Sequence, residues 1–332
     1  MLGGARDWLA GLGLGEFGAT VVLGVALIMG FLTFNVLFLI WLERKVSAHI
    51  QRRLGPMEVG PHGSLQTVAD MVKLLGKQIL TPVATDKFVY ILAPVLVFVP
   101  TLCLASLIPI SGAEAFAELP YGLVVLIALS GISVLAIFMA GWASNNKYAV
   151  LGGMRSVSQV IAYEIPILLA ALSVVMIAQS MNLREIVMAQ ARGVPFILLQ
   201  PVAGVLFFIG ITAETNRAPF DIPEAESELV GGFHTEYSGM RFAMFFFAEY
   251  TNMLVLGALG ATLFLGGWLG PWLPGPVWLL LKAYAVVFVM IWMRWTFPRL
   301  RFDQLMSFAW KLLIPVALVN LVITALVLGG GR

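Results

Sequence analysis

Long uncharged apolar segments, separated by shorter polar connections, dominate the pattern along this chain. A helix that crosses a bilayer needs about 20 mostly apolar residues, and one segment is free of charge from Phe17 to Leu42. The pattern predicts about eight membrane-spanning helices, over residues 17–42, 89–110, 121–142, 159–179, 196–213, 243–266, 277–296 and 308–328. The chain, residues 1–332, is therefore predicted to be a single all-α, polytopic membrane domain.

The composition supports lipid as the main solvent. Of the 332 residues, 60% are hydrophobic and 11% are charged, whereas a soluble domain carries roughly 25% charged residues. The net charge of +2 gives no reason to expect a nucleic-acid partner. No cleavable signal peptide is evident, because Arg6 and Asp7 precede a glycine-rich stretch without a basic leader.

Lysine and arginine are concentrated on one side of the predicted spans. With eight spans, both termini lie on the same side, and Lys282 falls inside a span. The terminal side holds only Arg6, Arg184, Arg192 and Arg332 of the 20 basic residues. Cytoplasmic loops carry the excess of Lys and Arg, so both termini are predicted to face away from the cytoplasm.

Residues 64–80 form a predicted amphipathic helix on the cytoplasmic side. Apolar Leu65, Val68 and Val72 recur at spacings of three and four, and polar residues such as Asp70 and Lys73 take the other faces. The stretch is too short and too charged to cross a membrane. It is predicted to lie at the interface or to pack on a partner protein, and both can hold together.

The connection at 214–242 is unusually acidic for the cytoplasmic side. Two prolines and several apolar residues interrupt it, which is not typical of a solvated acidic tail. Its acids are Glu214, Asp221, Glu224, Glu226, Glu228 and Glu236. Like charges this close together raise one another's proton affinity. The loop can serve proton transfer, or it can be an acidic patch that only docks a partner.

Four carboxylates are predicted to lie in the cytoplasmic half of the membrane: Glu43, Glu164, Glu214 and Glu249. Ionisable groups at this depth cost several kcal/mol and are usually functional. Each one alone fits a snorkelling or ion-paired side chain as well as a proton relay. Their convergence with the acidic loop favours the relay. Lys282, near the outer end of its span, is predicted to be a snorkelling anchor.

Redox centres and nucleotide sites are not predicted in this chain. Cys103 is the single cysteine, and the histidines His49, His62 and His234 lie in connecting segments. One thiol cannot build an iron–sulfur or zinc site. No glycine-rich dinucleotide motif follows a plausible strand. We therefore expect no metal, flavin or NADH to bind here.

Several motifs resemble those of one family. They are W-L-E-R-K-V at 41–46, Q-R-R-L-G-P-x-x-V-G-P-x-G-x-L-Q at 51–66, F-A-E-Y at 247–250, and the long run E-T-N-R-A-P-F-D-I-P-E-A-E-S-E-L-V at 214–230, continued by G-F-H-T-E-Y-S-G-M at 232–240. The chain resembles, over essentially its whole length, the quinone-site membrane subunits of proton-pumping NADH:quinone oxidoreductase, respiratory complex I.

The resemblance implies a location in the bacterial cytoplasmic membrane and a non-autonomous role. Members of this family form the membrane part of a quinone chamber, with ubiquinone or menaquinone as substrate. The implied partners are the peripheral-arm quinone-site and iron–sulfur subunits, the small membrane subunits and the antiporter-like subunits. Two other interpretations are a secondary transporter, for which no repeated halves are visible, and the membrane subunit of an energy-converting hydrogenase.

The resemblance also suggests roles for particular residues. The implied proton-relay residues are Glu164, Glu214, Glu224, Glu226, Glu228 and Glu249, with Asp70 as a further member. The implied residues of the quinone chamber and docking face are Arg44, Arg52, Arg217, Arg299 and Phe220. Arginine suits such a place because its planar fork holds carboxylates and can polarise a quinone oxygen. Quinone reduction is then expected to shift the pKa values of the nearby carboxylates.

Overall fold

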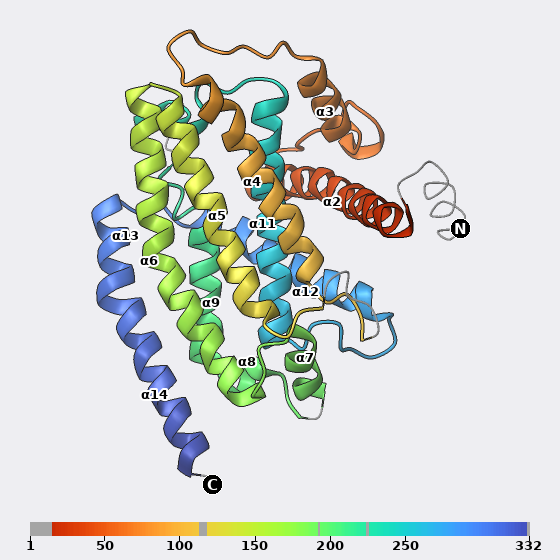
Figure 1. Ribbon diagram of the computed structural model, residues 1–332, viewed down its shortest axis with the longest axis vertical. Helices are drawn as coiled ribbons and strands as arrows, with labels where there is room; N and C mark the ends of the chain where they lie inside the picture. The colour runs from red at the N-terminus through yellow and green to blue at the C-terminus, as the bar shows by residue number, and fades with distance from the viewer. Residues whose placement is uncertain (1–14, 113–117, 192, 224–225, 331–332) are drawn as a thin grey trace.

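The computed structural model describes residues 15–112, 118–191, 193–223 and 226–330. Within these ranges, seven helices are long and apolar enough to cross a membrane. Figure 1 shows most of them side by side in a bundle, with α4, α5, α6 and α11 running downward from the upper part of the view. The predicted all-α, polytopic membrane fold is confirmed.

The spanning helices differ in length from the predicted apolar segments. They are α2 (Gly15–Ile50), α4 (Lys87–Leu107), α5 (Gly122–Ala143), α6 (Lys147–Ala178), α11 (Met240–Phe264), α12 (Gly275–Thr296) and α13 (Phe302–Phe308), which continues through a π-helical turn, η4 (Ala309–Leu313), into α14 (Ile314–Gly330). The shorter elements are η2 (Pro61–Gly63), α3 (Gln66–Gly76), α7 (Leu183–Ala191), α8 (Phe196–Leu199), α9 (Pro201–Glu214), α10 (Glu226–Leu229) and η3 (Gly232–His234). Hydropathy marks only the uncharged part of a span. Helices α2 and α6 therefore extend beyond their predictions, through segments that carry charge.

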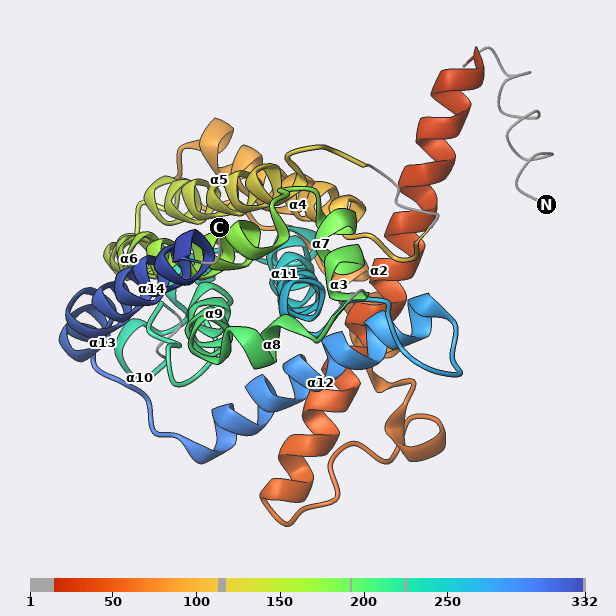
Figure 2. The same ribbon diagram turned by 90° about the horizontal axis from the view of Figure 1, so that it is seen from below.

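The helices are not parallel. Viewed from below, α9 and α11 are nearly end-on, whereas α2 and α12 are seen along their length and cross one another (Figure 2). Helix α11 packs against α2, α4, α9 and α12, and most of its side chains beyond Tyr250 are buried. This helix is therefore the centre of the bundle, and the tilted α2 and α12 run across one side of it.

The predicted fifth span, 196–213, is wrong as a single helix. Helix α8 ends at Leu199 and α9 starts at Pro201, with Gln200 non-helical between them. Unpaired polar groups are costly within a membrane, and here α14 supplies partners for the side chain at the break. Gln200 Nε2 donates to Thr324 Oγ1 at 2.8 Å, and Asn320 Nδ2 donates to Gln200 Oε1 at 3.0 Å.

The head group of Lys282, predicted to be a snorkelling anchor, is bound by backbone carbonyls of the turn that follows α11. Its Nζ donates to the carbonyl oxygens of Leu265, Gly267 and Leu269, at 2.7, 2.9 and 2.6 Å. These carbonyls lie just beyond the C-terminal end of α11, where a helix leaves backbone groups without partners. Lys282 thus ties α12 to the turn that follows α11.

We expect Lys282→Met to lower the apparent melting temperature of the protein in detergent by several degrees. The variant leaves three carbonyls without their charged donor, and a hydrogen bond from a charged group contributes about 1.5–3 kcal/mol. Lys87→Met is the matched control, because Lys87 is exposed at the start of α4. Equal melting temperatures for the two variants would contradict this role for Lys282.

Candidate functional site

Three polar side chains from three helices meet beside the end of α9. Glu214 is the last residue of α9, and the hydroxyl group of Ser130, on α5, hydrogen-bonds its carboxylate. Glu164, on α6, is close enough to interact electrostatically with Glu214. A Cβ atom added to Gly131 would lie 3.7 Å from Glu164 Oε1. The Glu164 carboxylate therefore lies in van der Waals reach of α5, next to Ser130.

Glu214 and Glu249 line the same cavity, although they lie on different helices. This cavity, called the carboxylate cavity below, has a volume of about 50 Å³. Its polar lining comes from Ser130, Ser133, Glu214, Thr215, Asn216, His234, Glu249 and Asn252. Ser133 Oγ and Asn252 Oδ1 are buried and make no hydrogen bond to a described residue. Apolar side chains line the rest of the cavity. The two carboxylates thus share a small cavity of mixed polar and apolar lining.

Arg217 connects Glu249 with a carboxylate on the tilted helix α2. Arg217 Nη2 lies 2.9 Å from Glu249 Oε1, and Nη1 donates to Glu43 Oε1 at 3.2 Å. The side chains of Arg217 and Glu43 are each 7% exposed. Burial alone would lower the pKa of Arg217, but Glu249 and Glu43 raise it well above its usual range. The guanidinium therefore stays charged between two carboxylates.

Arg294 and Tyr250 complete this buried ion cluster. Arg294, in the last turn of α12, donates to Glu43, and the hydroxyl group of Tyr250 donates to Glu43 at 2.7 Å. The Arg217 guanidinium also lies over the Tyr250 ring, 4.5 Å from its centroid. Two arginines balance Glu43 and Glu249, which is how buried charges are tolerated. The cluster holds α2, α11 and α12 together at one end of the bundle.

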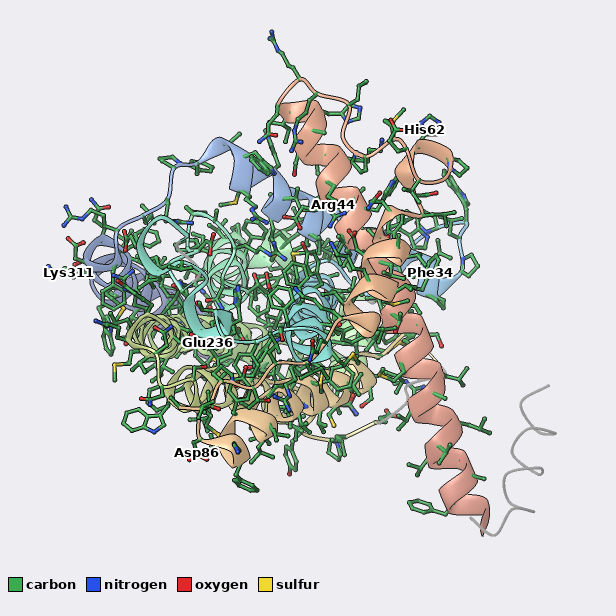
Figure 3. The ribbon with its side chains drawn as sticks, turned by 90° about the horizontal axis from the view of Figure 1, so that it is seen from above. Phe34, Arg44, His62, Asp86, Glu236 and Lys311 are labelled. Atoms are coloured by element: carbon green, nitrogen blue, oxygen red, sulfur yellow. The ribbon has the colours of Figure 1, made fainter. Side chains whose placement is uncertain are left out.

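The loop between α9 and α11, residues 215–239, is fixed to the bundle at several points. Gln159 Nε2, from α6, donates to the carbonyl oxygens of Ala213 and Phe220, both at 2.8 Å. Tyr90 donates to the Glu236 carbonyl at 2.6 Å, and Asn146 Nδ2 donates to Glu236 Oε1 at 2.7 Å. Seen from this end, the loop with Glu236 lies over the bundle (Figure 3). These bonds fix the groups that border the carboxylate cavity.

Two acids of this loop have different environments. Burial raises the pKa of Asp221, although Arg299, 3.1 Å from Asp221 Oδ2, acts in the opposite direction. Glu228 is exposed, and its hydrogen bond from Arg155, at 2.6 Å, lowers its pKa. Asp221 thus holds a proton more readily than an ordinary aspartate, and Glu228 stays ionised at neutral pH.

Several of the residues predicted from the sequence lie away from the carboxylate cavity. Asp70, on α3, pairs with Arg44 at 2.6 Å, and both side chains are more than a third exposed. Arg52 is exposed just beyond α2. Phe220 is 3% exposed and packs against Tyr163, with ring centroids 5.4 Å apart. Glu224 and the side chain of Glu226 lie outside the described residues.

Glu43 and Arg294 are central to the ion cluster. The sequence placed Glu43 among the four carboxylates at membrane depth but did not predict its arginine partners, and it suggested no site role for Arg294. The predicted first span ended at Leu42, where the charges begin, so Glu43 looked like the end of a helix. Helix α2 instead continues to Ile50 and places Glu43 inside the bundle, 5% exposed. The apolar residues that continue after Glu43, such as Val46, were the available signal.

No metal site is evident among the described residues, where groups of three or more His, Cys, Asp or Glu that could hold an ion are absent. The arrangement suits proton transfer instead. Carboxylates, hydroxyl groups and a small, partly polar cavity follow one another from Glu164 through Glu214 to Glu249, and an arginine then links Glu249 to Glu43.

Comparisons with known proteins give a consistent result. The model of the family described as NADH dehydrogenase matches residues 23–325. The chain is 52% identical to the H subunit of NADH-quinone oxidoreductase from Geobacillus kaustophilus over 309 residues, 91% of each chain. It is 48% identical to the H subunit from Carboxydothermus hydrogenoformans, over 92% of this chain and 88% of the relative. For the H subunit from Dehalococcoides mccartyi the identity is 45%, over 94% and 88%.

Proposed function

Because this chain belongs to the NADH dehydrogenase family, we propose that it is the quinone-site membrane subunit of a proton-translocating NADH:quinone oxidoreductase. It acts as a non-autonomous part of that enzyme in the bacterial cytoplasmic membrane, with both termini on the outer side. The names of the relatives favour this function over a secondary transporter or a hydrogenase subunit. The substrate is a quinone, either ubiquinone or menaquinone, which is reduced next to the cytoplasmic end of this subunit.

The observation that carries the proposal is the shared carboxylate cavity of Glu214 and Glu249. A site of about 10–15 Å³ holds one water molecule, so the 50 Å³ cavity has room for a few. Ser133 Oγ and Asn252 Oδ1 are suitable partners for such waters, because they are buried without another hydrogen bond in the described chain. Water in this cavity would let a proton move between the two carboxylates.

The ion cluster connects this relay with the redox side. We assign Arg294, Arg299 and the loop at 215–223 to the membrane wall of the quinone chamber, because they lie together at the predicted cytoplasmic end of the bundle. A change of charge there reaches Glu249 through Glu43 and Arg217, which are in direct contact. In a poorly hydrated interior, such a change alters the proton affinity of neighbouring acids.

The energy for the transfer comes from quinone reduction. Moving one charge across the membrane requires about 2.3 kcal/mol per 100 mV, so the relay must be driven by the redox step. Glu164, at the other end of the relay, is partly buried, and a neighbouring membrane subunit is proposed to continue the relay from there. The exposed apolar face of α3, with Val72 and Leu75, suits the lipid interface or a docked subunit.

We expect Glu214→Gln to lower quinone reduction and proton pumping together, by severalfold, without loss of the assembled complex. The amide keeps the shape and hydrogen bonds of Glu214 but cannot carry the proton. Both rates are measured in membrane vesicles and normalised to the amount of complex on a native gel. Glu118→Gln is the matched control, since Glu118 is exposed in an ion pair with Arg184. Wild-type turnover of a fully assembled Glu214→Gln complex would rule out this relay.

A further inference from the structure

His234 is the titratable group of the carboxylate cavity that the proposed relay does not use. It lines the cavity together with Glu214, Asn216 and Glu249, and its side chain is only partly exposed. We propose that His234 exchanges protons between the cytoplasmic side and the carboxylate cavity. This inference rests on the proposed function and adds to it the group through which protons reach Glu214 and Glu249.

The imidazole is held in place by two aromatic rings. Phe233 lies next to it in η3, with ring centroids 5.0 Å apart and an interplanar angle of 88°. Phe242, in the first turns of α11, contacts it edge-on, with centroids 5.4 Å apart and an angle of 66°. Both phenylalanines also line the cavity. In both pairs the edge of one ring faces the plane of the other. These edge-to-face contacts give the imidazole a defined orientation at the cavity wall.

The backbone around His234 is fixed as well. A Cβ atom added to Gly152 of α6 would lie 2.9 Å from Gly232 Cα, so the backbone of η3 rests directly on α6. Two residues after His234, the carbonyl and side chain of Glu236 are held by Tyr90 and Asn146. These contacts hold the backbone that carries His234 at the border of the cavity.

The chemistry of the surroundings suits transient proton transfer. Charged side chains among the cavity-lining residues are limited to the carboxylates Glu214, on α9, and Glu249, on α11. Burial lowers the pKa of His234 to about 4, so the imidazole is neutral at pH 7 and does not retain a proton. A lowered pKa suits a proton carrier, because the charged imidazolium is less stable than the neutral imidazole and passes its proton on.

The transfer is balanced as two steps. On the cytoplasmic side, an O–H bond of a hydronium ion breaks and leaves water, and the proton bonds to the unprotonated ring nitrogen, giving a short-lived imidazolium. That N–H bond then breaks, and the proton passes through cavity water to an ionised carboxylate, whose O–H bond forms. The imidazole returns to its neutral state, and no other reactant is consumed.

The test separates proton transfer from a purely structural role of the ring. His234→Phe keeps an aromatic ring beside Phe233 and Phe242 but has no nitrogen, whereas His234→Ala leaves space for imidazole added to the medium. We expect the assembled His234→Phe complex to lose quinone-coupled proton pumping and quinone reduction severalfold. We expect the pumping of the His234→Ala complex to recover partly when imidazole is added. Phe242→Leu is the control that loosens the ring contact and keeps the imidazole.

Each result of these measurements either supports or overturns the role of His234 in proton transfer. Wild-type rates for His234→Phe overturn the inference, and so does a loss in His234→Ala that imidazole does not restore while the complex is intact. If His234→Phe does not assemble, His234→Gln replaces it, with the same expected loss. Wild-type rates for Glu214→Gln would remove the proposed relay itself, whereas a defective Glu214→Gln with an active His234→Phe removes only the role of His234.

Discussion

Arg217→Met is expected to leave little intact complex, and what remains is expected to melt at a clearly lower temperature. The substitution keeps much of the side-chain volume but removes the cation between Glu43 and Glu249. Breaking a buried ion pair by removing one partner costs about 3–5 kcal/mol, because the other charge is left buried and uncompensated. Arg294 remains next to Glu43, so Glu249 is the carboxylate that loses its direct cationic partner.

The assignment of this cost to charge is tested by a second substitution. In Arg217→Met with Glu249→Gln, one carboxylate and one arginine of the ion cluster are gone together, and Glu43 still faces Arg294. We expect the double variant to recover part of the lost yield and melting temperature, as coupled neighbours do in a double-mutant cycle. Activity need not recover, because Glu249 is a proposed relay residue.

The control for Arg217 is an arginine in an exposed pair. Arg184 lies 3.3 Å from Glu118, and the two side chains are 41% and 48% exposed. Exposed ion pairs contribute about 0–1 kcal/mol, so Arg184→Met should assemble like the wild type. Equal yields and melting temperatures for Arg217→Met and Arg184→Met would show that the ion cluster does not hold the helices together.

Gly152→Ala is expected to displace the loop that borders the carboxylate cavity, and to lower both stability and turnover. A Cβ atom at position 152 would lie 2.9 Å from Gly232 Cα and 2.9 Å from the Phe233 nitrogen. These are backbone atoms of η3, so relief requires η3 to move away from α6. Overpacking of this kind typically costs about 1–3 kcal/mol, and the movement carries His234 with it.

The adjacent glycine provides a matched control on the same helix. A Cβ atom at Gly153 would meet its nearest atoms at 3.6 Å, which is ordinary van der Waals contact. The Gly153→Ala variant should therefore melt at the wild-type temperature or slightly above it, because alanine has a better helix propensity than glycine. Its rate of quinone reduction should equal that of the wild type. If Gly152→Ala behaves like Gly153→Ala in both measurements, close contact between η3 and α6 is not needed for function.

The two predictions concern two places at which the loop at 215–239 is attached to the bundle. Arg217 ties the carboxylate cavity to α2 and α12 through Glu43 and Arg294. Gly152 allows η3 to rest on α6, which fixes His234 and, through Glu236, the rest of the loop. Losses in both variants would show that relay chemistry depends on how the loop at 215–239 is held, in addition to the carboxylates themselves.

Most of the fold was predictable from the sequence alone. Each spanning helix makes its backbone hydrogen bonds within one continuous segment in the lipid, so its apolar residues are close together in the sequence. The apolar segments therefore marked the spans. The same reasoning placed Glu43, Glu164, Glu214 and Glu249 in the cytoplasmic half of the membrane. The predicted helix bounds were wrong where tertiary contacts replaced local rules: at Gln200, where side chains of α14 support a broken helix, and after Leu42, where α2 continues past the charges.

The partners of the charged groups were decided only by the tertiary structure. Glu43 and Arg217 are 174 residues apart in sequence, and their contact depends on the tilt of α2 across α11. The carboxylate cavity likewise requires α5, α9, α11 and η3 to converge. The sequence by itself therefore determined the spans and the depth of the acids in the membrane. Both depend on residues that are close together along the chain, since one continuous apolar segment forms each span. Which acids share a cavity, and which arginine they face, depended on helix packing, because those contacts join residues from distant parts of the chain.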